Sequence, residues 1–259
     1  MSKNYKPLDT DRISCDDDID IHYFEELDST NNWLKNNGDC GDVCICESQS
    51  EGRGRRGNSW QSPNIGNIYF SMCWCLDEQI KFHSLIGLIA GIATAEALTD
   101  CGVSGHGLKW PNDIYWQSKK LGGILIERSN QSERLIIGIG LNISLTESVK
   151  DLVGQECISI DEILGENEIS REILLSHLIY RLANHLKQLK SLKFDDFIGL
   201  WDNWDILRGK DVSFIHQGGK VSGIVDQLDE FGRLGIIKNN GSLEYFSSAD
   251  IKLENNLHK

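Results

Sequence analysis

The sequence predicts an α+β fold in which a larger domain of mixed strands and helices precedes a small all-β domain. From residue 19 to residue 207, short apolar runs typical of buried strands are interspersed with long segments of helical periodicity. After Arg208-Gly209, short alternating runs are separated by turns rich in Gly and Asn, which is typical of a small barrel. We therefore expect a flexible N-terminal segment at 1–20, a main domain at 21–207 and a β-domain at 208–259.

In the first half of the main domain, strands are expected at 19–24, 43–47 and 67–76, where apolar residues alternate or run together. Asp28 or Ser29 can cap a helix that starts directly after the first strand. Residues 81–101 carry apolar residues at helical spacing, with small residues that allow close packing.

In the second half, residues 107–127 predict a hairpin whose tip lies around 117–120. Residues 135–143 predict a strand with glycines at alternate positions, which favours close approach of a ligand or another backbone. Residues 151–168 are expected to form a loop, and 170–190 and 194–207 to form helices.

Composition excludes several functional classes. The chain has 26 Lys and Arg against 39 Asp and Glu, a net charge of −13, so a broad nucleic-acid-binding face is not expected. No apolar run is long enough to cross a bilayer, and the first residues lack the apolar core of a secretory signal, so we expect a cytoplasmic protein without membrane contact.

The eight cysteines include no C-x-x-C pair and no Cys/His cluster at zinc spacing, so no metal site is expected. Two pairs, Cys44/Cys46 and Cys73/Cys75, lie in expected strands. We interpret these cysteines as buried, reduced thiols.

The run Gly52-Arg-Gly-Arg-Arg-Gly57 concentrates positive charge in an acidic chain. Glycine allows backbone N–H groups to converge on an anion, and arginine holds carboxylate or phosphate oxygens in pairs. The run alone fits a solvated basic turn or a nucleic-acid segment as well as a site for a small anion.

Four further stretches accompany this run: Asp28-Ser-Thr-Asn31, Lys109-Trp-Pro-Asn-Asp-Ile114, Lys120-Leu-Gly-Gly-Ile-Leu125 and Gly138-Ile-Gly-Leu-Asn142. In this order and spacing they resemble the catalytic core of biotin protein ligases over about residues 24–145, and residues 209–254 resemble that family more loosely. The resemblance implies a class II synthetase-like catalytic domain with a mixed β-sheet and flanking helices, followed by an SH3-like barrel.

The resemblance also implies a reaction. ATP activates biotin to biotinyl-5′-AMP, and the biotinyl group then passes to one lysine of a biotin carboxyl carrier protein or domain. A lipoate or octanoate ligase or transferase on a related core is the first alternative, and a non-catalytic biotin- or RNA-binding module is the second. Because two anions must meet in the first step, cations are required at the reacting atoms.

Carried over residue by residue, the resemblance assigns three sets of side chains. Lys120, Arg55 and Asp113 are implied in catalysis, with Asp113 orienting groups or accepting a proton. The biotin-binding set is Ser29, Thr30, Asn31, Gln49, Arg53, Gly54, Arg55, Trp60 and Lys120, and the nucleotide-binding set is Arg56, Asn112, Lys120 and Asn142. Mg²⁺ is expected to arrive with ATP and not in a dedicated protein site.

The chain departs from the family pattern at two places. Asn58 stands where the family often has a further arginine, which leaves the triphosphate contact one cation short. Residues 156–160 lack the aromatic residue that often covers adenine.

The expected partners and assembly also follow from the resemblance. About twenty residues precede the core, which is too few for a DNA-binding domain, so we expect a monofunctional ligase that does not bind DNA. Edge strands would allow a homodimer.

Overall fold

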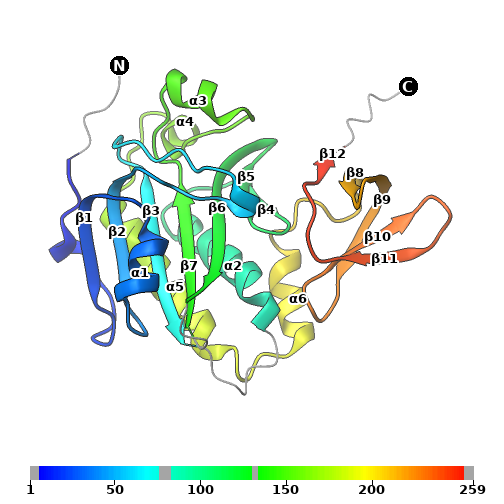
Figure 1. Cartoon of the computed structure of the whole chain (residues 1–259), viewed down its shortest axis with the longest axis horizontal. Coiled ribbons are helices and arrows are strands. Elements are labelled where there is room, and N and C mark those ends of the chain that lie inside the picture. Colours follow the sequence, from blue (N-terminus) through cyan, green and yellow to red (C-terminus); the bar gives the residue numbers. More distant parts are fainter. Residues whose placement is uncertain (1–5, 76–82, 130–133, 254–259) are drawn as a thin grey trace.

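The computed structural model describes residues 6–75, 83–129 and 134–253. Its main sheet has seven strands in the order β1-β2-β3-β7-β6-β5-β4, of which β1 and β2 are parallel and the other neighbours antiparallel (Figure 1). The bounds are β1 (Ile21–Leu27), β2 (Val43–Gln49), β3 (Ile68–Cys75), β4 (His106–Lys109), β5 (Asp113–Trp116), β6 (Lys119–Arg128) and β7 (Arg134–Leu141). The prediction of a mixed sheet is confirmed, as are the hairpin and the strand with alternate glycines.

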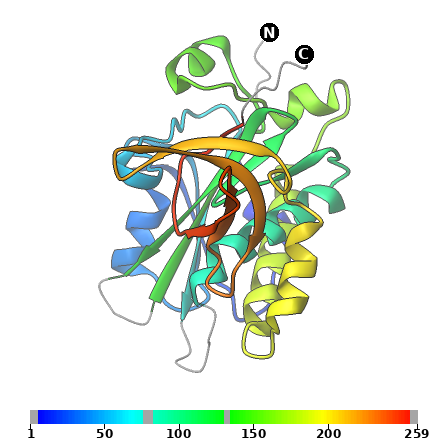
Figure 2. The same cartoon turned by 90° about the vertical axis from the view of Figure 1, so that its right-hand side faces the viewer.

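Helices cover both faces of this sheet. In Figure 2, α1 (Thr30–Asn37) lies on one side, and α2 (Ile86–Asp100), α5 (Arg171–Gln188) and α6 (Phe194–Asp202) lie on the other. Helix α2 is buried on almost every side because it lies between the sheet and α5, which explains its lack of a polar face. The described residues also include three 3₁₀ turns, which are η1 (Thr10–Arg12), η2 (Arg55–Gly57) and η3 (His83–Leu85).

The C-terminal residues form a second, strongly curved antiparallel sheet (Figure 2). Its order is β11-β10-β9-β8-β12, with bounds β8 (Asp211–His216), β9 (Gly219–Leu228), β10 (Leu234–Lys238), β11 (Leu243–Phe246) and β12 (Lys252–Leu253). Trp110 Nε1 donates to the Gly232 carbonyl at 2.9 Å, which attaches this sheet to the β4–β5 turn. The α+β class with an SH3-like second unit is confirmed, while the exact domain boundaries stay a prediction.

The expectation of a loop at 151–168 is wrong in part. Residues 151–153 belong to helix α3 (Glu147–Val153) and residues 160–164 form helix α4 (Ile160–Leu164), while the rest of the stretch lies outside helices. Thr146 caps α3 by accepting the Val149 N–H, and Ser159 forms a capping box with Glu162. Such caps stabilise helices that are too short to show a clear apolar period.

The expectation of a loosely attached N-terminal segment is wrong for residues 6–20. Leu8 and Ile13 are buried in the main core. The Leu8 N–H donates to Glu47 Oε1 at 2.7 Å, and Glu47 is itself paired with Arg171 at 2.7 Å. Apolar burial and this buried ion pair hold the segment against β2 and α5.

The cysteine interpretation is correct for Cys44, Cys46 and Cys73, which are buried thiols. It is wrong for Cys75, which forms a disulfide with Cys40, 35 residues earlier in the sequence. None of the helices in the described ranges has the length and apolar character that crossing a membrane requires.

Candidate active site

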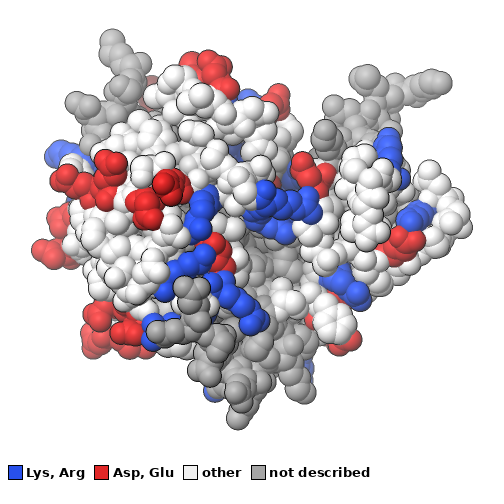
Figure 3. Space-filling view, viewed as in Figure 1, with Lys and Arg blue, Asp and Glu red and all other residues white. Residues whose placement is uncertain are grey.

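A cavity of about 830 Å³ lies over the β6–β7 part of the main sheet, between the Gly/Arg loop, α3 and the loop before β12. Every residue predicted for catalysis, biotin binding or nucleotide binding lines it. Lys and Arg side chains gather around the hollow at the centre of the face in Figure 3, while many Asp and Glu side chains lie at its rim. The predicted concentration of positive charge is therefore local, as the sequence indicated.

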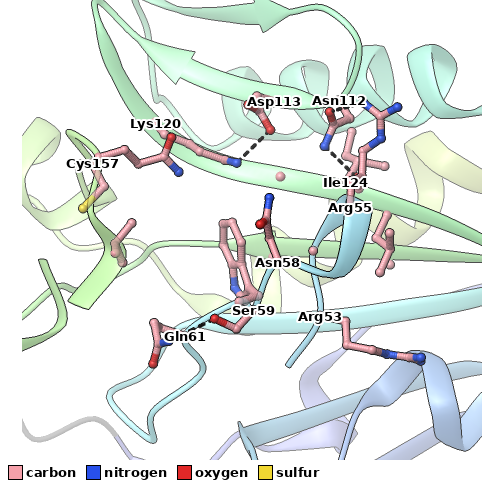
Figure 4. Close-up of a pocket in the computed structure, with 18 of the residues that line it drawn as sticks. Arg53, Arg55, Asn58, Ser59, Gln61, Asn112, Asp113, Lys120, Ile124 and Cys157 are labelled. Atoms are coloured by element: carbon pink, nitrogen blue, oxygen red, sulfur yellow. Dashed lines mark hydrogen bonds and ion pairs between the residues drawn. The ribbon is translucent and has the colours of Figure 1, made fainter. Parts of the chain in front are cut away.

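The β5–β6 hairpin positions Lys120 and Asp113. In the hairpin register Lys120 lies opposite Tyr115, and Asp113 lies opposite Gly123. The side chains turn toward each other, and Lys120 Nζ is 2.8 Å from Asp113 Oδ1 (Figure 4). Lys120 Nζ also lies 5.4 Å from the centre of the Trp60 ring. The ammonium group is therefore held over an aromatic face, inside the cavity and beside a carboxylate.

The Gly/Arg loop directs its arginines to two sides. Arg55 donates to Asn112 Oδ1 at 2.9 Å and to Ser248 Oγ at 3.0 Å, and Arg56 donates to the same Ser248 Oγ at 2.7 Å. Burial, followed by the neighbouring Arg56 charge, lowers the pKa of Arg55 below its usual range. Figure 4 shows Arg53 at the other side of the cavity, pointing away from Lys120.

The loop turns sharply between these arginines. Arg56 has a φ of 56° and Gly57 a φ of 79°, both in the left-handed region, which explains a glycine at position 57. Gly52 serves a different purpose, because a Cβ there would lie 2.3 Å from the Trp60 carbonyl oxygen. The glycines therefore allow a tight loop that returns close to its own start.

The end of the cavity at the start of α1 is polar and neutral. The Thr30 N–H donates to Gln49 Oε1 at 2.9 Å, and Gln49 Nε2 donates to Ser62 Oγ at 2.8 Å. Ser29, Thr30 and Asn31 are each less than 5% exposed. Buried hydroxyl and amide groups without net charge suit a ligand that both donates and accepts hydrogen bonds.

Glycines of β7 form part of the cavity floor. A Cβ at Gly140 would lie 2.7 Å from the Trp60 ring, and a Cβ at Gly138 would lie 2.3 Å from Asn31 Oδ1. The expectation was close approach of a ligand or another backbone; the structure instead shows two side chains of the site, Asn31 and Trp60, resting directly on the strand.

Two polar atoms in the cavity lack partners. Arg53 Nε and Trp60 Nε1 are buried and make no hydrogen bond within the described part of the chain, whereas the buried Asp113 Oδ1 lies 2.8 Å from Lys120 Nζ. Such groups cost free energy when they are left unsatisfied. They therefore mark positions where a polar ligand would gain hydrogen bonds.

The two asparagines of the predicted nucleotide set also hold the backbone. Asn112 Nδ2 donates to the Ile124 carbonyl at 3.0 Å, and Asn142 Nδ2 donates to the Ile158 carbonyl at 3.2 Å. The Ile158 N–H in turn donates to the Lys120 carbonyl at 3.0 Å. Asn142 thus fixes the 156–160 loop beside the catalytic lysine candidate.

The sequence reasoning missed some residues of the cavity. Lys109 is a further cation, whose pKa is lowered by burial although Asp113 and Asp250 oppose that shift. Its Nζ donates to the Tyr115 hydroxyl at 3.3 Å. Lys109 lies within a motif quoted from the sequence and could have been identified. No sequence pattern pointed to Asp250, which lies between β11 and β12 of the second sheet.

Helix α3 contributes an apolar wall that was also missed. Val149, Leu152 and Val153 line the cavity, and Leu152 is 69% exposed. Their i, i+3, i+4 spacing after the capping residue Thr146 was the available signal.

Comparison with known proteins agrees with this geometry. Residues 23–144 match the Biotin/lipoate A/B protein ligase family. The bifunctional ligase/repressor BirA of Salmonella typhimurium is 31% identical over 253 residues, which cover 95% of this chain and 78% of that protein. The biotin--[acetyl-CoA-carboxylase] ligase of Mycobacterium tuberculosis is 28% identical, over 75% of this chain and 72% of that protein.

Solved structures give the same result. The structure of the biotin protein ligase from Aquifex aeolicus in complex with biotin and ATP has a TM-score of 0.78 and 30% identity, and the match covers 90% of this chain and 98% of that one. The biotin protein ligase from Leishmania major in complex with biotinyl-5-AMP has a TM-score of 0.58 and 26% identity, over 90% of this chain and 100% of that one. The chain therefore belongs to the Biotin/lipoate A/B protein ligase family, among its biotin protein ligases.

Proposed function

We propose that this chain joins biotin to ATP and then transfers the biotinyl group to a lysine of a biotin carboxyl carrier protein or domain. One observation carries the proposal: a single cavity combines a neutral polar end with a cationic region around Lys120. Biotin has the matching halves, a neutral ureido ring and a carboxylate. The biotin ring lies at the start of α1, and the carboxylate points toward Lys120.

The first step brings two anions together. A carboxylate oxygen of biotin attacks the α-phosphorus of ATP, the bond to the bridging oxygen breaks, and pyrophosphate leaves. Lys120 and Arg55 offset the negative charge of both reactants and of the transition state. Arg53 and Gly54 close the loop over biotin, which excludes water from the mixed anhydride that forms.

The second step needs a neutral amine. The carrier lysine attacks the acyl carbon, the bond to the phosphate oxygen breaks, AMP leaves, and the ammonium formed loses a proton. Asp113 is the carboxylate paired with Lys120, whose Nζ lies 2.8 Å from its Oδ1. We assign Asp113 the role of orienting the amine and accepting that proton.

The nucleotide occupies the other side of the cavity. Arg56 and Asn112 contact the phosphates, and Asn142 keeps the neighbouring loop in place. The apolar residues of α3 cover adenine in place of an aromatic side chain. Lys109 lies in the same cavity and supplies a cation that Asn58 does not.

Mg²⁺ enters with the ATP phosphates. No group of three His, Cys, Asp or Glu side chains in the described ranges could form a metal site. The cavity carboxylates are Asp113 and Asp250, and the first is paired with Lys120. The residues present fit a metal carried by the nucleotide, which would reduce the negative charge of the phosphates.

The test is an intact-mass measurement on a carrier domain incubated with this protein, ATP-Mg²⁺ and biotin. We expect one biotinyl group on one lysine, with equimolar release of pyrophosphate. Parallel reactions supply octanoate or lipoate in place of biotin and should leave the carrier mass unchanged. A carrier modified by lipoate but not by biotin would overturn the proposal. That the chain does not act on DNA, and that its edge strands allow a homodimer, stay predictions.

A further inference from the structure

A continuous chain of hydrogen bonds runs beneath the neutral end of the cavity. It starts at Glu127 on β6, whose Oε2 accepts from Asn31 Nδ2 at 2.8 Å. Asn31 Oδ1 accepts from Ser71 Oγ at 2.6 Å, and Ser71 Oγ lies 2.7 Å from Thr30 Oγ1. The chain therefore connects a carboxylate at the edge of the site to a hydroxyl that lines the cavity.

Glu127 is surrounded by positive charge. Lys35 Nζ lies 2.5 Å from its Oε1, and Arg53 Nη2 lies 3.2 Å from its Oε2. Burial alone would raise the pKa of Glu127, but the hydrogen bonds from Lys35 and Asn31 and the charge of Arg53 bring it below its ordinary value. Glu127 is therefore an anion at neutral pH.

A carboxylate can only accept hydrogen bonds, and this fixes the direction of every link. Asn31 must turn its NH₂ group toward Glu127, because its oxygen at 2.8 Å would be repelled. Its oxygen then faces Ser71, so the single Ser71 hydrogen is committed to Asn31. Two hydroxyls 2.7 Å apart must share one hydrogen, which the hydroxyl of Thr30 supplies.

Among the described residues, Thr30 Oγ1 has one competing acceptor, Gln49 Oε1, at 3.2 Å. That oxygen already accepts the Thr30 backbone N–H at 2.9 Å, and the contact with Ser71 is the shorter of the two. Once the Thr30 hydrogen points to Ser71, only lone pairs remain to face a ligand. If Asn31 were reversed, the Ser71 hydrogen would point to Thr30, and Thr30 would be free to donate instead.

We propose that Glu127 is a positioning residue that sets the hydrogen-bond direction in the biotin pocket, so that Thr30 Oγ1 accepts and selects a ligand N–H over a ligand oxygen. The inference rests on the proposed function for the identity of the ligand. It assigns Glu127, which lies outside the cavity lining, a role in specificity. Gln49 complements this arrangement because its amide keeps one hydrogen beyond the bond to Ser62.

The test compares biotin with its two cyclic-carbamate analogues, in each of which one ureido N–H is replaced by oxygen. Binding is measured by calorimetry on the wild type, Glu127→Gln and Ser71→Ala. In the wild type, one analogue should bind at least about 100-fold more weakly than biotin, because a lone pair would face the lone pairs of Thr30. In both variants the Thr30 hydroxyl is free to donate to the ligand. The ratio of the Kd of that analogue to the Kd of biotin should therefore fall by about tenfold or more.

Glu96→Gln is the matched control. Glu96 is also 19% exposed in its side chain and paired with Arg181 and His185, but it lies on the surface of α2, away from the cavity. Its selectivity ratio should equal that of the wild type. A purely structural role for Glu127 would weaken biotin and both analogues by the same factor, and an unchanged ratio in Glu127→Gln would therefore overturn the proposal.

A second measurement separates this inference from the proposed function. Should wild-type protein bind neither biotin nor its analogues, the function is wrong, and the hydrogen-bond direction is then read from ¹⁵N NMR of the Asn31 side-chain amide. Its hydrogens should resonate downfield in the wild type, because they face a carboxylate, and should move upfield in Glu127→Gln. Side-chain amide signals that do not move would refute the role of Glu127.

Discussion

Replacing Gly138 by alanine tests how closely the site is packed against the sheet. The new Cβ would lie 2.3 Å from Asn31 Oδ1 and 3.0 Å from Asn31 Cγ. Ordinary Cβ contacts begin at 3.4 Å, so the carboxamide must withdraw by about 1.1 Å, the difference between 3.4 and 2.3 Å. The backbone of Gly138 has no positive φ, so alanine itself introduces no backbone strain there.

The withdrawal breaks two buried hydrogen bonds. The bond from Ser71 Oγ is 2.6 Å long and the bond to Glu127 is 2.8 Å long, and a shift of this size takes either one past the useful range. Each loss leaves a buried polar atom unsatisfied and costs about 1–3 kcal/mol. Alanine recovers about 0.4–1 kcal/mol by restricting the unfolded chain. The expected net loss is about 1–6 kcal/mol in the free energy of unfolding.

Urea denaturation followed by circular dichroism measures that loss, and calorimetry measures biotin affinity on the same samples. Gly87→Ala on α2 is the control, because its Cβ would meet only Ile126 Cγ1 at 3.4 Å and should be neutral or stabilising by up to about 1 kcal/mol. Unfolding of Gly138→Ala at the wild-type urea concentration, together with normal biotin affinity, would show that Asn31 is not displaced.

Three further predictions concern the reaction, the loop and acid stability. Lys120→Ala should reduce biotin-dependent pyrophosphate release by about 10²–10³-fold with little change in Tm, and an unchanged rate would contradict its catalytic role. Ser248→Ala removes the acceptor that holds Arg55 and Arg56, so trypsin should cleave the ligand-free loop faster; equal cleavage rates would show that Ser248 does not restrain it. The lowered pKa of Glu127 contributes stability that is complete above its ordinary value of 4.5 and is lost as pH falls through the lower folded value. Unfolding of Glu127→Gln should therefore depend less on pH below 4.5 than the wild type does, and identical acid profiles would argue against a native-state interaction.

The parts of the site that sequence could predict share one property: chemistry and backbone geometry act there over a few residues. The Gly/Arg loop needs glycine at Gly52 and Gly57 for close approach and a left-handed turn, and these glycines stand beside the arginines that the reaction requires. The alternate glycines of β7 likewise indicated close contact before the contacting side chains were known. Short motifs of this kind can be interpreted from the sequence alone, because their chemistry and backbone geometry do not depend on contacts with distant segments.

The parts that could not be predicted depend on contacts between distant segments. Cys40 and Cys75 are 35 residues apart, and only the β2–β3 pairing brings them together. Ser248 follows β11 in the second sheet, yet it accepts hydrogen bonds from Arg55 and Arg56. Glu127 continues a regular strand pattern, so nothing local distinguishes it from an ordinary solvent-facing residue.

The positions of the three arginines suggest how an acidic protein keeps a cationic site stable when it is empty. Neighbouring positive charges repel, and burial adds a desolvation cost. Arg53 is compensated by Glu127, while Arg55 and Arg56 are held by the neutral acceptors Asn112 and Ser248. Neutral acceptors satisfy the guanidinium hydrogens without cancelling their charge. The side of the cavity assigned to the phosphates therefore keeps its positive charge for the nucleotide, while on the biotin side Glu127 offsets part of the positive charge of Arg53 and Lys35, which suits a neutral ureido ring.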